Sequence, residues 1–505
     1  MVSKFFDIQG KSSTSLCRRV RVKMKGALKT ILVSLVTIAG LAVIGWSAFD
    51  IRMNAIRTFG LVIHEFDPWF NFRAAQYLAD NGLSRFFKWY DYMSWSPLGR
   101  PVGTTIYPGM QIASVTIWKV LNMIGVEMSL NDVCCYTPVY FGVAASMLLC
   151  MLIYVCTASI ASALSGGIIM AIIPAHLMRS VGGGYDNESV AVSCLTLTFL
   201  LWMLSLAQKD SRKYSFIGIL TGLAYTCMVA SWGGFIFVLN MIGLHATFLV
   251  LIGRFSNKLY WSYTLWYIVG TIGAMQVPVV GWTPLKSLEQ LAPMAVFFGI
   301  QLLQLCENES FMKLFGINKS TRTTGQKLML WSQVFGLAAV CASIIIAILY
   351  PTGYFGPLSS RIRGLFVKHT RTGNPLVDSV AEHQPANSSS FYQFLHYTCY
   401  IAPFGFALAV FNCIIKPFFK PSSFDSTTDP MTFVVVYASV TYKFATKMNR
   451  LMLLMGPVSG TRKRGLHTHT HTHTHIHTYT HTHLHSQSSR TLVHPPSSPR
   501  SYHGI

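Results

Sequence analysis

Acidic side chains are scarce in this sequence of 505 residues. Only 18 Asp and Glu occur against 40 Lys and Arg, and all charged residues together make up 11% of the chain. Soluble globular proteins carry about 25% charged residues, whereas 51% of this chain is hydrophobic. The shortage of charge excludes an ordinary soluble domain and predicts a protein embedded mostly in a membrane.

Cysteine motifs that build metal or redox sites are also missing. The 11 Cys lie mostly inside apolar stretches, and no CxxC motif occurs. The only close pair is Cys134 and Cys135, and neighbours in sequence make a poor disulfide. We therefore expect small, membrane-buried cysteine side chains, which excludes a cysteine-based metal or redox framework.

The net charge of +22 would suggest nucleic acid binding in a soluble protein. Here the bases gather in short clusters between apolar segments, which is typical of cytoplasmic loops. The clusters span residues 18–25, 209–213, 254–258, 313–327 and 416–420. Membrane orientation therefore explains the charge, and no nucleic acid partner is expected.

Apolar runs of about 20 residues predict about twelve transmembrane helices in an all-α membrane bundle. The first run, 27–48, follows a basic N-terminus (1–26) and lacks a clear small-residue cleavage site, which favours a signal anchor over a signal peptide. The runs begin near Ala27, Tyr136, Ser159, Glu188, Tyr214, Gly233, Leu259, Leu288, Leu328, Tyr392 and Pro430, with a shortened one near Asn449.

The stretch 106–126 decides the topology, because it is apolar but contains Pro108 and Lys119. If it lies along the membrane surface as an amphipathic helix, all the basic clusters fall on one face, the cytoplasmic one. The same choice brings the acid-bearing loops together on the opposite face. These loops are 51–130, 180–189 and 351–391.

The acids in these loops are spaced for metal binding. Glu65 and Asp67 stand two apart in HEFDPWF, Asp186 and Glu188 stand two apart after three glycines, and Glu382 lies in DSVAEHQ. Such carboxylates can turn toward one hard cation, Mg²⁺ or Mn²⁺, and glycine permits the tight backbone needed. A lone loop acid is usually a solvated charge, but three such loops on one face indicate metal-assisted glycosyl or phosphoryl transfer from a lipid-linked donor.

Two arginines near the bilayer suggest a phosphate. Arg179 precedes Asp186 by seven residues, and Arg450 lies near the start of the last apolar run, KMNRLMLLMGP. An ionised Arg in mid-membrane costs about 2.5–3.5 kcal/mol on insertion scales and marks function by default. Snorkelling to the interface is the ordinary alternative; it stays open for Arg179, whereas the functional interpretation is favoured for Arg450.

These motifs resemble those of the catalytic subunit of oligosaccharyltransferase. That family carries EFDPW, YDNE and SVSEHQ in its lumenal loops, and this sequence has EFDPW at 65–69, YDNE at 185–188 and SVAEHQ at 379–384. Ala381 replaces Ser, a small-for-small change. The resemblance covers roughly residues 25–457 and implies a GT-C-type membrane glycosyltransferase, all-α with large lumenal loops.

The resemblance implies en bloc transfer of an oligosaccharide from dolichyl diphosphate to Asn in N-x-S/T sequences of acceptor polypeptides. The reaction would take place at the lumenal face of the endoplasmic reticulum membrane, with other subunits as possible partners. Asp67 and Glu382 would grip the acceptor carboxamide, Arg179 would support the acidic site, and Arg450 would contact the donor diphosphate. The implied ligands of Mg²⁺ or Mn²⁺ are Asp67, Asp186 and Glu188.

The end of the chain departs from the family pattern. The family continues into a lumenal domain with a WWDYG motif that recognises the Ser or Thr of the acceptor, but the last Trp here is Trp331. We therefore expect this domain to be missing and transfer to be impaired. The tail, 459–505, alternates His with Thr and then turns Ser/Pro-rich, which is typical of a translated CA repeat, either disordered or a gene-model artefact, rather than of a zinc site.

Two alternative functions stay open from the sequence. A glycosyltransferase that uses a dolichyl-phosphate sugar would share the first-loop acids but has no reason to carry SVAEHQ. An inactive membrane subunit would fit the departure at the end of the chain. A transporter is disfavoured, because transporters place their charges in mid-span and the acids here lie in loops.

Overall fold

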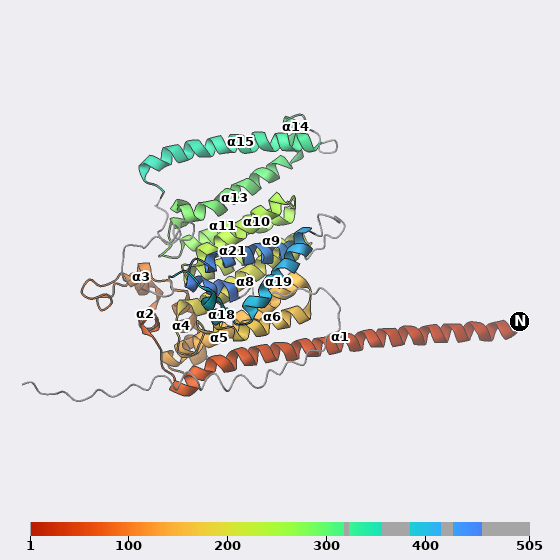
Figure 1. The fold of residues 1–505 in the computed structure, drawn as a ribbon, viewed down its shortest axis with the longest axis horizontal. Helices are drawn as coiled ribbons and strands as arrows, with labels where there is room; N and C mark the ends of the chain where they lie inside the picture. Colours follow the sequence, from red (N-terminus) through yellow and green to blue (C-terminus); the bar gives the residue numbers. More distant parts are fainter. Residues whose placement is uncertain (1, 318–322, 356–383, 416–427, 457–505) are drawn as a thin grey trace, which may run out of the picture. The chain divides into compact units, whose positions relative to one another are not determined.

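The computed structural model describes residues 2–317, 323–355, 384–415 and 428–456. Within these ranges the regular secondary structure is helical, and the one β-type pairing is an isolated bridge between Asp91 and Arg100. The prediction of an all-α fold is confirmed (Figure 1). The longer helices are α1 (Val2–Phe59), α2 (Phe66–Phe86), α4 (Gly109–Met123), α5 (Leu130–Thr157), α6 (Ile160–Ile172), α8 (Asn187–Ala207), α9 (Ser211–Ser231), α10 (Phe235–Leu251), α11 (Asn257–Met275), α13 (Leu288–Cys306), α15 (Thr324–Leu349), α19 (Thr398–Val410) and α21 (Thr428–Ala445).

Short helical segments connect these elements. They are α3 (Val102–Thr105), α7 (Pro174–Leu177), α12 (Thr283–Lys286), α14 (Glu309–Leu314) and α18 (Ser388–Leu395), with the 3-10 helices η1 (Tyr350–Thr352) and η5 (Asn449–Met455) and the π-helix η3 (Phe411–Ile415). Two of them bear directly on the site, because α7 precedes Arg179 and η5 contains Arg450.

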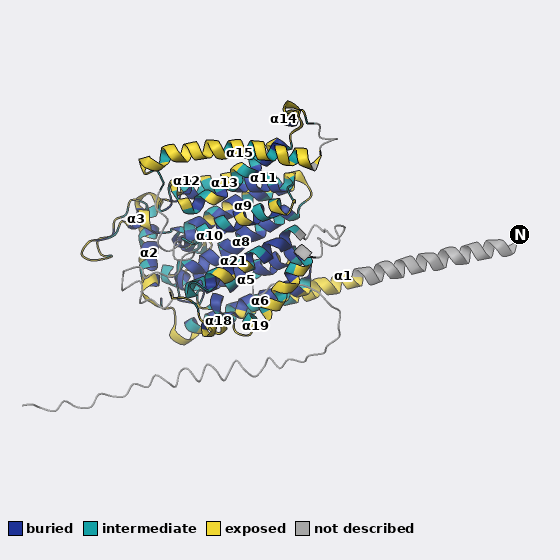
Figure 2. Cartoon of the chain, turned by 45° about the horizontal axis from the view of Figure 1, so that its top comes forward, coloured by how far each residue is buried: buried dark blue, intermediate teal, exposed yellow. Residues whose placement is uncertain are grey.

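Helix α8 is the centre of the bundle. It packs against α5 and α9, α9 packs in turn against α11, and α1 packs against α5 and α6. In its most apolar window, 72% of the α8 residues are buried, whereas none are buried in the corresponding window of α15, which is exposed along its length in Figure 2. An apolar helix without a protein cover is typical of a span that faces lipid.

Six described helices are long and apolar enough to cross a membrane: α1, α5, α8, α9, α13 and α15. The bent pair α18 and α19 would make a seventh span, and α6 and α10 are shorter apolar helices. Every other predicted span also coincides with a helix of the described chain. The count of about twelve stays a prediction, because these remaining helices are shorter or less apolar.

Helix α1 continues to Phe59, into the predicted first external loop, whose bounds 51–130 stay a prediction. The loop then contains α2, α3 and α4. Helix α4 confirms the helix expected over 106–126, and it packs against α2, α5 and α9. Its buried residues recur at helical spacing on one face; they are Met110, Gln111, Ser114 and Val115. Its position at a membrane surface stays a prediction.

Helix α21 joins a basic end of the bundle to an acidic end. At its start the Asp429 carboxylate lies 2.6 Å from Arg254 and 3.6 Å from Lys258. Just after its other end, Arg450 pairs with Glu188. One basic cluster and one acidic loop therefore lie at opposite ends of the same helix, as the charge pattern predicts. The cluster 416–420 lies outside the described residues.

Three glycines bring the second acidic loop onto the first. The amide of Gly182 donates to the Arg52 carbonyl at 3.0 Å, and the Gly183 carbonyl accepts from the His64 amide at 3.0 Å. Gly183 has φ +84°, and a Cβ there would lie 2.4 Å from the Val62 carbonyl oxygen. The glycines therefore permit close approach of two protein backbones, which places HEFDPWF beside YDNE.

Replacing Gly183 with Ala should weaken this contact. We expect a loss of about 2–4 kcal/mol in unfolding free energy, because a left-handed backbone strains any L side chain and the added methyl group overpacks the loop. Gly60→Ala is the matched control, because Gly60 has φ +81° but nothing within 4 Å of a Cβ, and should cost about 1–2 kcal/mol. Chemical unfolding in detergent micelles compares the two variants, and equal losses would contradict the close approach.

Candidate active site

Asp186 and Glu188 stand at the start of helix α8. Asp186 is the N-cap, and its Oδ1 accepts a hydrogen bond from the Asn187 amide at 2.7 Å. Glu188 lies in the first turn and is only 1% exposed. Acids are favoured at both positions, because they satisfy free amides and interact with the positive end of the helix dipole. The local sequence therefore accounts for the place of both carboxylates.

Glu188 lies between the two arginines predicted from the sequence. The Arg179 Nε is 3.1 Å from the Glu188 Oε2, and the Arg450 Nε donates to the Glu188 Oε1 at 2.8 Å. A buried carboxylate is stable only when it is paired and hydrogen-bonded. Both arginines therefore pair with the buried carboxylate, and their functional roles stay predictions. We call Arg179, Glu188 and Arg450 the Glu188 cluster.

The third acidic loop reaches the same place. The Asn449 amide, next to Arg450, donates to the Gln384 carbonyl at 3.0 Å. Gln384 is the last residue of SVAEHQ, so the motif ends beside the Glu188 cluster. Glu382 itself lies outside the described residues, and its predicted role stays a prediction.

A buried hydrogen-bond network, which the sequence did not signal, connects the first loop to YDNE. The Gln111 side chain donates to Asn71 at 3.1 Å, and Asn71 donates to the Tyr185 carbonyl at 3.3 Å. The Tyr185 hydroxyl donates to Ser114 at 2.9 Å. Because buried polar groups are costly unless they are paired, this network holds α2 and α4 against the residue that precedes Asp186.

Burial, together with the neighbouring Glu188 carboxylate, raises the pKa of Asp186 to about 6. The Asn187 amide, Arg450 and Arg179 lower it in part. An acid whose ionised form is disfavoured in this way gains from an added cation. Asp186 therefore has the electrostatic setting of a metal ligand.

Asp67 is exposed and lies in the first turn of α2. It is close enough to Arg100 to raise the pKa of that guanidinium, although burial lowers it more. Arg100 lies over the ring of Phe70 at 4.7 Å. Before Asp67, the N-cap Glu65 has φ +66°, a conformation that costs energy for a residue with a side chain.

Of the predicted cation ligands Asp67, Asp186 and Glu188, the structure brings the last two together. In the described part of the chain, no three His, Cys, Asp or Glu side chains lie close enough to hold one metal ion. Both carboxylate oxygens of Glu188 already face arginines. Of the two residues, Asp186 therefore has the carboxylate better suited to a hard cation. The full ligand set stays a prediction.

Sequence reasoning missed two buried charged groups. Arg52 is 0% exposed, although the predicted span ends at Ala48 and leaves it in the first loop. Asp91 pairs with Arg73 at 2.8 Å, and this hydrogen bond helps to lower the pKa of Asp91 to about 2. No local sequence pattern marks either residue, because each pairs with residues on other elements of the fold.

With this geometry in place, comparison with known proteins is decisive. The family described as "Oligosaccharyl transferase STT3, N-terminal" matches residues 31–459. The chain belongs to the STT3 family. Its relatives include the dolichyl-diphosphooligosaccharide–protein glycosyltransferase subunits STT3 of Saccharomyces cerevisiae, 34% identical over 82% of this chain and 54% of the relative, and stt-3 of Caenorhabditis elegans, 34% identical over 84% and 52%.

Solved STT3-like structures share the fold. The archaeal oligosaccharyltransferase AglB of Archaeoglobus fulgidus, in complex with an inhibitory peptide and a dolichol-phosphate, superposes with a TM-score of 0.66 at 14% identity, over 84% of this chain and 49% of that one. The Archaeoglobus fulgidus enzyme in complex with Zn and sulfate gives a TM-score of 0.60. The chain spans about half the length of the curated relatives it matches.

The raised pKa of Asp186 predicts a pH-dependent stability. Between its ordinary value of 3.8 and about 6, the folded protein binds a proton that the unfolded chain releases, so this carboxyl makes stability fall as pH rises through that interval. The loss should reach roughly 1–3 kcal/mol. Unfolding of wild type and Asp186→Asn in EDTA from pH 4 to 7 measures the difference, since Asn keeps the cap.

The exposed Asp80 of α2 provides the control for this pH experiment. Its replacement by Asn removes a carboxylate without touching the site, so the pH profile should match wild type. Parallel profiles for wild type and Asp186→Asn would show that burial does not disfavour the ionised form of Asp186.

Glu188→Gln should be strongly destabilising, because it leaves two guanidinium groups facing a neutral side chain of the same shape. We expect a loss of about 3–5 kcal/mol in unfolding free energy, as for other broken buried pairs. Asp50→Asn is the control, because Asp50 pairs with Arg57 at 2.6 Å with both side chains about half exposed, and such pairs contribute at most about 1 kcal/mol. Similar losses in the two variants would be inconsistent with a buried Glu188 cluster.

Proposed function

We propose that this STT3-family chain takes part in protein N-glycosylation, as the part of an oligosaccharyltransferase that binds the lipid-linked donor and carries the acidic site. The reaction is en bloc transfer of an oligosaccharide from dolichyl diphosphate to Asn in N-x-S/T sequences. The observation that carries the proposal is Arg450, which borders both an apolar cavity and the Glu188 cluster. Relatives at 34% identity are dolichyl-diphosphooligosaccharide–protein glycosyltransferase subunits, which supports it.

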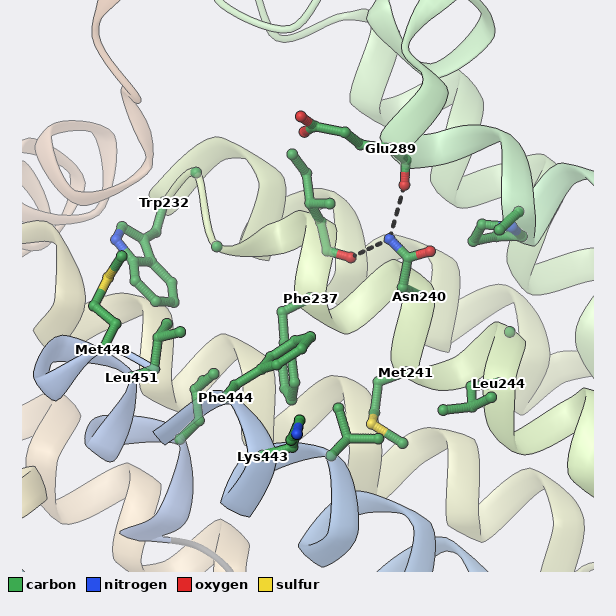
Figure 3. Close-up of a pocket in the computed structure, with 18 of the residues that line it drawn as sticks. Trp232, Phe237, Asn240, Met241, Leu244, Glu289, Lys443, Phe444, Met448 and Leu451 are labelled. Carbon is green, nitrogen blue, oxygen red and sulfur yellow. Dashed lines mark hydrogen bonds between the residues drawn. The ribbon is translucent and has the colours of Figure 1, made fainter. Parts of the chain in front are cut away.

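The cavity has the chemistry that a lipid-linked donor needs. It has a volume of about 1210 Å³ and lies between α10, α13, α21 and η5. Figure 3 shows Phe237, Met241 and Phe444 around it. Apolar walls suit a polyprenyl chain, and a guanidinium group suits a diphosphate, because it can donate two parallel hydrogen bonds to phosphate oxygens. Arg450 stands where these two requirements meet.

The site residues have complementary parts in this scheme. The acceptor nitrogen would form a bond with the sugar C1 as the bond from C1 to the diphosphate oxygen breaks, with inversion at C1. Dolichyl diphosphate would leave with the electron pair of that bond, and the proton lost by the amide would pass to water. Asp67 and Glu382 would accept hydrogen bonds from the acceptor carboxamide and orient its nitrogen. Arg450 would stabilise the diphosphate leaving group, and Arg179 would keep Glu188 ionised.

A divalent cation, Mg²⁺ or Mn²⁺, would be held by Asp67, Asp186 and Glu188 and would supply positive charge to the acidic site. The setting of Asp186 fits this role, and the Archaeoglobus fulgidus structure with Zn and sulfate supports a divalent ion in the family. Glu188 fits only if one arginine moves away. Arg450 is suited to do so, because a bound diphosphate would attract it from the Glu188 Oε1.

The topology supports a lumenal site in the membrane of the endoplasmic reticulum. The acidic loops gather at the end of the bundle opposite the 254–258 basic cluster, and basic clusters mark the cytoplasmic face. Acceptor polypeptides and other oligosaccharyltransferase subunits would then meet the chain from the lumen.

Complementation of cells depleted of their own catalytic subunit tests the function. Glycan occupancy of reporter glycoproteins should be restored by this chain or by a form extended with the second half of its relatives. Asp67→Ala and Glu382→Gln should each lower transfer about 10²–10³-fold, the range for loss of a group that acts in the transition state. Asp80→Ala, on the exposed face of α2, should leave transfer and membrane insertion unchanged.

Each outcome of the complementation bears on a separate part of the proposal. Restoration by the extended form alone would place acceptor recognition in the second half. Failure of both forms, with normal insertion, would overturn the transferase assignment. Full activity of Asp67→Ala would remove Asp67 from the site.

A further inference from the structure

Arg52 is a buried cation with no part in the scheme above. It lies in the last turns of α1, is 0% exposed, and has no carboxylate partner among the described residues. Its Nε donates to the Ser180 Oγ at 2.9 Å, and its Nη1 donates to the carbonyls of Ala48 and Ala171, both at 2.9 Å. Because an ionised Arg in a membrane helix is costly, it marks a functional position by default.

The contacts of Arg52 converge on the segment that enters the acidic site. Ser180 follows Arg179 directly, and the Gly182 amide donates to the Arg52 carbonyl at 3.0 Å. The side chain of Arg52 therefore holds one end of the stretch 180–182 and its backbone holds the other. Arg179, at the start of this stretch, reaches Glu188 at 3.1 Å.

Neighbouring elements are shaped around Arg52. A Cβ at Gly142 on α5 would lie 2.2 Å from the Arg52 Nε, so only glycine leaves room for the side chain at that point. The Ala171 carbonyl belongs to the last turn of α6, where helix carbonyls lack partners within the helix. Arg52 thus ties α6 and the second acidic loop to α1.

We propose that Arg52 is a positioning residue: it fixes the stretch 180–182 so that Arg179 faces Glu188. The planar guanidinium group of Arg52 is needed, because a lysine ammonium cannot donate to the Ser180 hydroxyl and to the carbonyls of Ala48 and Ala171 in the same directions. The effect of Arg52 on the position of residues 180–182 does not depend on the proposed function, whereas its effect on turnover rests on that function.

Hydrogen exchange of the full-length chain in detergent micelles tests the proposal. In Arg52→Lys and in Ser180→Ala, amides of residues 179–189 should exchange about tenfold faster, since local opening there no longer breaks the Arg52 contacts. Amides of α9 and α11 should keep their wild-type rates. Arg57→Lys is the matched control, because Arg57 lies on the same helix in an exposed pair, and all its rates should stay unchanged.

Two results would overturn the positioning role. One is wild-type exchange over 179–189 in both variants. The other is faster exchange spread evenly over the bundle, which would show that Arg52 only stabilises the fold. Gly142→Ala, which keeps the Arg52 residue but displaces its Nε, should reproduce the local change.

Turnover provides a second readout. In the form that restores glycosylation, Ser180→Ala should lower kcat about tenfold and leave KM for the acceptor peptide unchanged, because the acceptor does not meet Ser180; unchanged kcat would overturn the proposed effect on turnover. If no form of the chain transfers an oligosaccharide, the proposed function fails, and the exchange measurement still decides the role of Arg52.

Discussion

A carboxylate buried at the start of a membrane helix must be paired, and this requirement organises the acidic end of the molecule. Glu188 is satisfied only where Arg179 and Arg450 meet it. One arginine precedes the glycine turn and the other follows α21, so the pairing connects parts of the chain that are far apart in sequence. The cavity borders the same Arg450. A single electrostatic constraint therefore places the cavity beside the acidic loops.

Directed hydrogen bonds add to the apolar packing that joins the loops at this end. Asn71 and Gln111 reach Tyr185, and His64 reaches the backbone of Gly183. These bonds have a defined direction, so they orient YDNE more closely than apolar contacts could. The resulting enclosure also explains the chemistry of Asp186, because burial beside Glu188 disfavours its ionised form and makes an added cation favourable.

Much of the fold and part of the site could be predicted from local sequence. The lengths of apolar runs predicted the helices, and the spacing of scarce acids singled out Asp186 and Glu188. Arg52 escaped prediction because its hydrogen-bond partner Ser180 is 128 residues away, and no periodicity reports such a distance. The hydrogen bonds of Asn71 and Gln111 could not be predicted for the same reason, since in the sequence each looks like an ordinary polar residue of a helix.

The sequence by itself determined the all-α membrane class, the acid-bearing loops and the candidate site residues, because run length, charge sign and motif are properties of neighbouring residues. Only the tertiary structure decided which of these residues meet. It placed both arginines on Glu188, left Asp67 exposed, and buried Arg52 beneath the second loop. The reason is physical: pairing of buried charge depends on distance in space, which a linear pattern of residues does not contain.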